Sequence, residues 1–150
     1  MLTLPTSRGT VGLASASPTD PPLIEPNYFA TSMDQATLVH GVQRLLQCLT
    51  STSAGQDIVE NEVSPAAGMK SLTTDSSKEE IVDRIRNMGF PHFHPGGTCA
   101  LGSVVDTELR VKGVQALRVV DASVFPAPVG GHPQATLYTV AEQAAVMIAG

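Results

Sequence analysis

The sequence predicts an α+β fold, and three observations lead to this prediction. Short runs of alternating apolar residues, typical of strands, occur at 7–15 and in the first half of 117–125. Two segments with helical spacing of apolar residues each begin with a Ser-x-x-Gln or Ser-x-x-Glu capping signal. A third helical pattern, rich in alanine, closes the chain. The order strand, helix, helix, strand, helix is therefore a mixed architecture.

Length and composition bound the class of protein. A chain of 150 residues fits one domain, spanning 1–150, and its 42% hydrophobic content is ordinary for a globular protein. The net charge of −5, with no basic run, argues against a nucleic-acid partner. No apolar stretch approaches the roughly 18–20 residues of a membrane span, so no span is expected. The first residues lack the apolar region of a secretory signal, and the localisation stays unknown.

The first elements are short. Residues 7–15 read as a strand with Val11 and Leu13 on one face. Residues 18–29 contain four prolines, which remove backbone donors and disfavour a helix, so this segment is expected to be an extended, turn-rich connection.

The first helix is expected to begin at a capping box of Ser32 and Gln35. Residues 50–76 are rich in Ser, Thr, Gly and Ala and are expected to form a loop, with at most a short extended piece at 57–63. The apolar positions that share helical spacing in the first helix are Leu38, Val42, Leu45, Leu46 and Leu49.

A second helix is expected after Ser77, which with Glu80 forms another capping box, and Gly89 is expected to end it. Residues 117–125 begin as a strand that ends before Asp121. From Pro133 onward the spacing predicts a long terminal helix with small residues suited to close packing, namely Leu137, Val140, Ala141, Ala144, Ala145 and Ile148.

Two histidines precede prolines, and each lies beside a glycine pair. His94 is followed by Pro95 and His132 by Pro133, and a residue before proline is held in extended backbone. Pro133 suits the first position of a helix, so His132 would lie at the helix N-terminus, where the dipole is positive. The glycines let a ligand approach the backbone closely. The combination indicates a site built from two imidazoles.

Other interpretations of these residues stay open. His92 and His94 form an H-x-H pair that could bind a metal with His132 as a third ligand, although no acidic residue or cysteine stands at a firm spacing. His40 lies within the first helix and reads as a surface residue. The glycine pairs could be ordinary turns, and Asp121 could be a turn former.

The second half of the chain resembles a known family. "HPGGTCALG", followed by "GVQALRVVDASVFPAPVGGHPQATLYTVAEQAA", is similar to the C-terminal signature of the glucose–methanol–choline (GMC) oxidoreductases. The opening "SRGTVGLASASPTDPPLIEPNYF" resembles the start of that family's C-terminal region. Within the family, the resemblance is closest to the fungal aryl-alcohol oxidase and choline dehydrogenase branches. It implies an FAD-dependent oxidoreductase that acts on the CH–OH group of a small-molecule alcohol, and a substrate-side domain with a mostly antiparallel sheet and a long C-terminal helix.

The resemblance also implies roles for individual residues. His94 matches the histidine that acts as the base on the alcohol, and His132 matches the second active-site position. An unperturbed imidazole, with a pKa near 6.5, suits proton removal near neutral pH. Asp121 and Ala122 match the segment whose backbone meets the phosphate or ribitol part of FAD. The start of the helix that points at the flavin ring matches Pro133, Gln134, Ala135 and Thr136.

One departure from the family pattern changes the expectation. The chain contains no G-x-G-x-x-G loop to hold the ADP half of FAD, so the Rossmann-like FAD-binding part is missing. We therefore expect a C-terminal fragment of a larger two-domain flavoprotein. The FAD-binding domain of that protein is absent from this chain, and the isolated chain is expected to be inactive. The alternative is a non-catalytic remnant or partner-binding module derived from the family.

Overall fold

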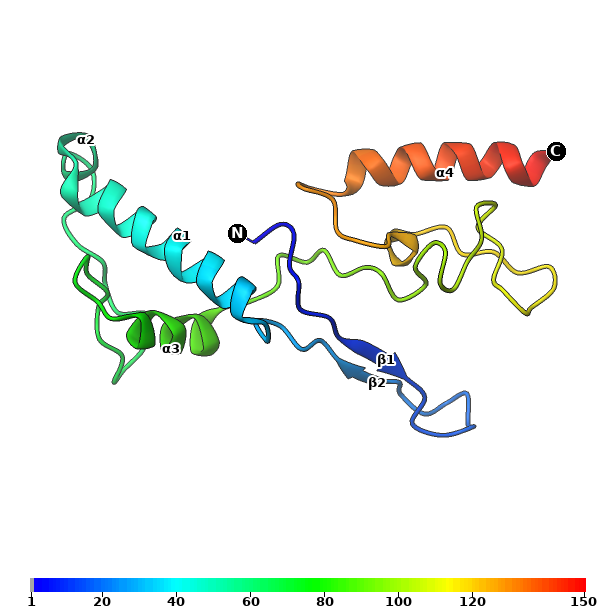
Figure 1. Cartoon of the computed structure of the whole chain (residues 1–150), viewed down its shortest axis with the longest axis horizontal. Helices are drawn as coiled ribbons and strands as arrows, with labels where there is room; N and C mark the ends of the chain where they lie inside the picture. The colour runs from blue at the N-terminus through cyan, green and yellow to red at the C-terminus, as the bar shows by residue number, and fades with distance from the viewer. Residues whose placement is uncertain (1) are drawn as a thin grey trace. The chain divides into compact units, whose positions relative to one another are not determined.

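The computed structural model describes residues 2–150, which form two compact units (Figure 1). One unit consists of Leu2 and Tyr28–Phe90, and the other of Thr3–Asn27 and Pro91–Gly150. The first contains helices α1 (Ser32–Ser51), α2 (Ser53–Gln56) and α3 (Lys78–Met88). The second contains strands β1 (Thr10–Gly12) and β2 (Leu23–Glu25), a 3₁₀ turn η1 (Ala122–Val124) and helix α4 (Gln134–Ala149).

Helix α1 begins one residue earlier than the capping signal predicts. Thr31, in extended backbone, is the N-cap, and its side chain accepts a hydrogen bond from the backbone N–H of Asp34 at 3.2 Å. The side-chain amide of Gln35 donates to the carbonyl of Phe29 at 3.1 Å. The predicted Ser32–Gln35 capping box is therefore wrong, because a neighbouring Thr offers the same hydroxyl acceptor one position earlier.

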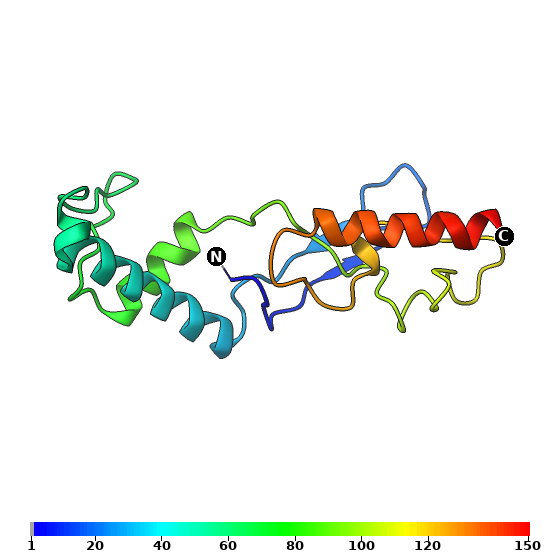
Figure 2. The same cartoon turned by 90° about the horizontal axis from the view of Figure 1, so that it is seen from above.

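The core of the helical unit lies between α1 and α3, which pack against each other (Figures 1 and 2). The prediction for α1 holds for Leu46, which is buried, but Leu45 is 57% exposed. Two adjacent leucines lie about 100° apart around a helix, so both cannot face the same partner. The buried members of this core are Val39, Leu46, Leu72 and Ile81, with Val42, Val82 and Ile85 packed against them.

Helix α3 confirms the second capping box. Glu80 N–H donates to the Ser77 hydroxyl at 3.1 Å, and Ser77 N–H donates to the Glu80 carboxylate at 2.9 Å. These bonds hold the pKa of Glu80 below its ordinary value, chiefly through the backbone N–H of Ser77. Gly89 caps the other end as predicted, although in extended backbone (φ −67°).

The segment between α1 and α3 differs in part from the predicted loop. It includes the one-turn helix α2, whose N-cap Thr52 accepts from Gly55 N–H at 3.1 Å. No strand forms at 57–63 in the part of the chain that the structure describes. Instead, the carboxylate of Glu62 pairs with the half-buried guanidinium of Arg84 on α3 and accepts from Leu72 N–H at 2.6 Å. Side-chain bonds, rather than a sheet, therefore hold this segment.

The sheet is much smaller than the mostly antiparallel sheet that the family resemblance implied. Over residues 2–150 it consists of β1 and β2, paired antiparallel with Val11 opposite Ile24. β2 lies in the proline-rich segment predicted as a connection, between Pro22 and Pro26. Proline lacks the N–H of a sheet ladder, which limits β2 to three residues.

The strand predicted in the first half of 117–125, before Asp121, does not form. A single bridge joins Arg118 to Arg110, and after Asp121 the chain turns into η1. The apolar side chains of this segment nevertheless enter the core of the second unit, under α4. That core consists of Val105, Leu109, Val124 and Ala144, with Val104, Val111, Val119, Val120, Phe125 and Val140 packed against it.

The long terminal helix is confirmed as α4, with Val140 and Ala144 directed at this core. Pro133, the predicted first helical residue, is instead the N-cap, so the helix begins one residue later, at Gln134. None of the helices in the described chain has the length and apolarity needed to cross a bilayer.

Replacing Ile81 by alanine tests the core of the helical unit. Ile81 is fully buried, so Ile81→Ala should lower the free energy of unfolding by about 2–5 kcal/mol. The control Ile58→Ala, at a side chain that is 80% exposed, should change it by less than about 0.5 kcal/mol. Urea unfolding followed by far-UV circular dichroism measures both; equal effects would contradict this core.

Candidate active site

The segment that carries His94 is held against η1 by backbone hydrogen bonds. Gly97 N–H donates to the carbonyl of Ala122 at 3.2 Å, and Cys99 N–H to that of Ser123 at 2.9 Å. Leu101 N–H continues the series to Val124 at 2.9 Å. Backbone hydrogen bonds therefore hold residues 97–101 against η1. These bonds also position the neighbouring residues, including His94.

The glycine pair Gly96–Gly97 allows the backbone to approach η1 this closely. A Cβ atom at Gly96 would lie 2.7 Å from the carbonyl oxygen of Ala122, which is backbone and cannot move aside easily. Gly97 has φ +87°, in the left-handed region that favours glycine. In contrast, Cβ atoms at Gly130 and Gly131 would meet nothing within 4 Å. The second pair thus leaves open space beside His132.

The structure brings the two predicted histidines together, although they are 38 residues apart. His94 Nε2 lies 2.7 Å from His132 Nδ1, a hydrogen bond in which one ring nitrogen donates and the other accepts. The ring centroids are 4.9 Å apart and the planes meet edge-to-face at 85°. Both residues are exposed, so a ligand can reach them.

His92, for which the family resemblance implied no role in alcohol chemistry, lies beside this pair. Its ring centroid lies 5.3 Å from that of His94 and 5.3 Å from that of His132. Between His92 and His94, Phe93 has φ +56°, an unfavourable value for a bulky residue. The only sequence signal for this neighbour was the H-x-H spacing.

Helix α4 begins next to the imidazole pair. Its N-cap, Pro133, makes no side-chain capping hydrogen bond. The first helical residues Gln134, Ala135 and Thr136 are exposed, and the Gln134 amide donates to the Tyr138 hydroxyl at 3.2 Å. The Pro133 side chain thus leaves the positive end of the helix dipole uncapped, and this end can meet a ligand.

Asp121 and Ala122 have clear structural contacts. The Asp121 carboxylate accepts from Ser123 N–H at 2.8 Å and so caps η1. The hydroxyl and the backbone N–H of Ser123 hold the pKa of Asp121 below its ordinary value. Ala122 provides the carbonyl that anchors Gly97. The cofactor contacts predicted for both residues stay predictions.

Comparison with known proteins identifies the relationship. Residues 5–141 match the family model of the C-terminal part of GMC oxidoreductases. The chain belongs to the GMC oxidoreductase family. The GMC-type oxidoreductase acuG of Aspergillus aculeatus is 42% identical over 148 residues, covering 99% of this chain and 28% of the relative.

Solved structures of GMC relatives share the fold. A fungal aryl-alcohol oxidase matches with a TM-score of 0.79 and 32% identity, over 98% of this chain and 24% of the oxidase. An FAD-dependent oxidoreductase from Chaetomium thermophilum matches with a TM-score of 0.82 and 29% identity, over 97% of this chain and 25% of that protein. The chain thus spans about a quarter of the length of these FAD-dependent relatives and corresponds to their C-terminal part.

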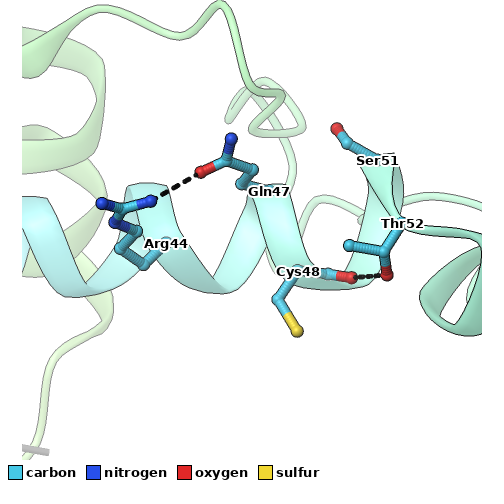
Figure 3. A pocket seen from close by; sticks show the side chains of 5 residues that line it. All are labelled: Arg44, Gln47, Cys48, Ser51 and Thr52. Carbon is cyan, nitrogen blue, oxygen red and sulfur yellow. Dashed lines mark hydrogen bonds between the residues drawn. The ribbon is translucent and has the colours of Figure 1, made fainter.

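A surface hollow and a fourth histidine in the helical unit are less suited to catalysis than the histidine pair. A surface hollow in the helical unit is lined by Arg44, Gln47, Cys48, Ser51 and Thr52 (Figure 3). There the Arg44 guanidinium donates to the Gln47 side chain, and the Thr52 hydroxyl donates to the Cys48 carbonyl. Both hydrogen bonds join residues that line the hollow. His40, on α1, is exposed, as predicted.

Gly96→Ala should test whether close backbone approach shapes the site. The added Cβ must displace the carbonyl of Ala122, which should cost about 1–3 kcal/mol of unfolding free energy. The matched control Gly130→Ala meets open space and should change it by less than about 1 kcal/mol. Urea unfolding measures both, and an equally tolerated Gly96→Ala would refute the role assigned to this glycine.

Proposed function

We propose that this chain supplies the catalytic histidines and part of the flavin environment of an FAD-dependent alcohol oxidoreductase. The observation that supports it is the hydrogen-bonded pair of His94 and His132 at the uncapped start of α4. The proposed substrate is a small-molecule alcohol, oxidised at its CH–OH carbon. Membership of the GMC family, with a fungal aryl-alcohol oxidase among its similar structures, points to the same chemistry.

In this proposal His94 accepts the proton of the alcohol hydroxyl. Loss of that proton raises electron density on oxygen and makes the neighbouring C–H bond a better hydride donor. His132 holds the same oxygen by a hydrogen bond. A hydroxyl group can both donate and accept, so it can replace the mutual bond of the two rings and keep both nitrogens satisfied.

The residues fit one end of an FAD molecule. FAD, when bound, supplies the acceptor for the hydride. The exposed first turn of α4, Gln134–Thr136, presents the positive end of a helix dipole, which favours the negative charge that hydride transfer generates. The open space at Gly130 and Gly131 would let the group approach backbone. We assign the ADP half to a different part of the protein, because this sequence contains no G-x-G-x-x-G loop.

The exposed apolar side chains of α4 support the proposal that another polypeptide segment covers this helix. On α4, Tyr138, Val146 and Ile148 are 60–67% exposed, and the helix has a single charged residue, Glu142. An exposed, largely apolar helix can form an interface with another polypeptide. In our proposal the FAD-binding part covers it. The alternative, a non-catalytic module that evolved to stand alone, would instead require the isolated chain to be soluble and cooperatively folded.

Replacing His94 in the flavin-loaded enzyme that contains this segment tests the proposed base. His94→Gln keeps a polar side chain but removes the basic nitrogen, so reduction of the flavin by primary and aryl alcohols should slow by about 10²–10⁴-fold. The amount of flavin retained after desalting should change little. Anaerobic stopped-flow absorbance measures the rate, and His40→Gln is the matched control. An unchanged rate of flavin reduction would remove His94 from the mechanism.

The isolated chain should bind FAD weakly or not at all. Without a phosphate-binding loop, most of the contacts to the ADP half are missing. Mixing the purified chain with FAD and desalting should therefore leave colourless protein. Stoichiometric yellow flavin in the protein fraction would disprove the proposed division of the FAD site.

A further inference from the structure

We propose that His92, His94 and His132 together form a binding site for a divalent transition-metal ion of the Zn²⁺ type. These are three of the four histidines in the chain. One ring nitrogen from each histidine lies within 4.8 Å of the corresponding nitrogens of the other two, and all three residues are exposed. This site goes beyond the proposed alcohol chemistry, which uses only His94 and His132 and involves no metal.

The ligand set selects the class of ion. Imidazole nitrogens suit Zn²⁺, Cu²⁺ and Ni²⁺, whereas Ca²⁺ and Mg²⁺ require oxygen ligands. The cluster consists of histidines alone, without a carboxylate. Three histidines also leave one position of a tetrahedral Zn²⁺ ion open to water.

The geometry requires only side-chain adjustment. Zn–N bonds of about 2.0–2.1 Å place tetrahedral ligand nitrogens about 3.3 Å apart. His94 Nε2 and His132 Nδ1, now 2.7 Å apart, would separate by about 0.6 Å as the shared proton is replaced by the ion. The other nitrogens, at most 4.8 Å apart, would move inward by up to about 1.5 Å. Exposed rings can make such movements by rotating about their side-chain bonds.

The backbone already gathers the three ligands. His92 and His94 flank Phe93, whose left-handed conformation places their rings 5.3 Å apart. Pro95 restricts the main chain that follows His94, and Pro133 restricts the main chain that follows His132. A partly assembled site loses less conformational entropy on binding than three independent side chains would.

A bound ion would occupy the nitrogen lone pairs that our proposed mechanism uses. Metal and alcohol would therefore compete for His94 and His132, and a Zn²⁺-loaded chain would hold no free base there. Metal binding itself does not depend on flavin, so the test below can fail while the alcohol chemistry stands, and the reverse.

Calorimetric titration of the purified chain with ZnCl₂ at neutral pH is the primary test. We expect one ion per chain. The single variants His92→Gln, His94→Gln and His132→Gln should each raise the dissociation constant at least tenfold. His40→Gln, at the exposed histidine of α1, and the variants Cys48→Ser and Cys99→Ser should leave it within twofold.

A second measurement avoids substitutions altogether. One equivalent of Cu²⁺ added to the unmodified chain should give an electron paramagnetic resonance spectrum with coupling to three imidazole nitrogens, and excess Zn²⁺ should displace it. Coupling to fewer nitrogens, an absence of saturable binding, or a His92→Gln variant that binds as tightly as the original chain would each overturn the three-histidine site.

Discussion

The candidate site depends on one set of backbone contacts, in which residues 97–101 donate hydrogen bonds to the carbonyls of η1. Backbone pairing of this kind is independent of side-chain identity, except where a side chain would intrude. Gly96 meets that constraint, because any Cβ there would collide with the Ala122 carbonyl. These contacts fix the chain just after His94 against the chain that leads into His132 and α4. Two imidazoles separated by 38 residues can then share one hydrogen bond.

Local signals in the sequence predicted the elements whose stability is local. The Ser77–Glu80 capping box and the long helix after Pro133 needed only neighbouring residues, and both are present. Predictions that depended on distant partners fared worse. Leu45 fits a helical pattern but is exposed, and 117–120 packs into a core with only one bridge, from Arg118 to Arg110. Apolar periodicity reports burial, whereas a strand also requires a neighbour with free backbone groups.

The candidate site was predictable in part for the same reason. The prolines and glycines around His94 and His132 marked both residues, and family resemblance joined them into one site. The H-x-H spacing suggested His92 only as an alternative metal ligand. Its position against both rings depends on the left-handed backbone of Phe93, a conformation that propensity assigns to glycine or asparagine. Sequence patterns do not indicate where the backbone is strained, and here the strained residue, Phe93, lies between two of the clustered histidines.

The bond between the two rings also makes their tautomers interdependent. When neutral His94 carries its proton on Nε2, its outer nitrogen Nδ1 is an acceptor, and His132 must then carry its own proton on its outer nitrogen Nε2. In the opposite arrangement His132 Nδ1 donates to His94 Nε2, so His94 Nδ1 is the outer donor and His132 Nε2 the outer acceptor. While both rings are neutral, the pair therefore offers one acceptor and one donor at its extremities. Reversing this polarity requires two proton movements: one across the shared bond, and one that leaves the outer nitrogen of one ring while another joins the outer nitrogen of the other ring.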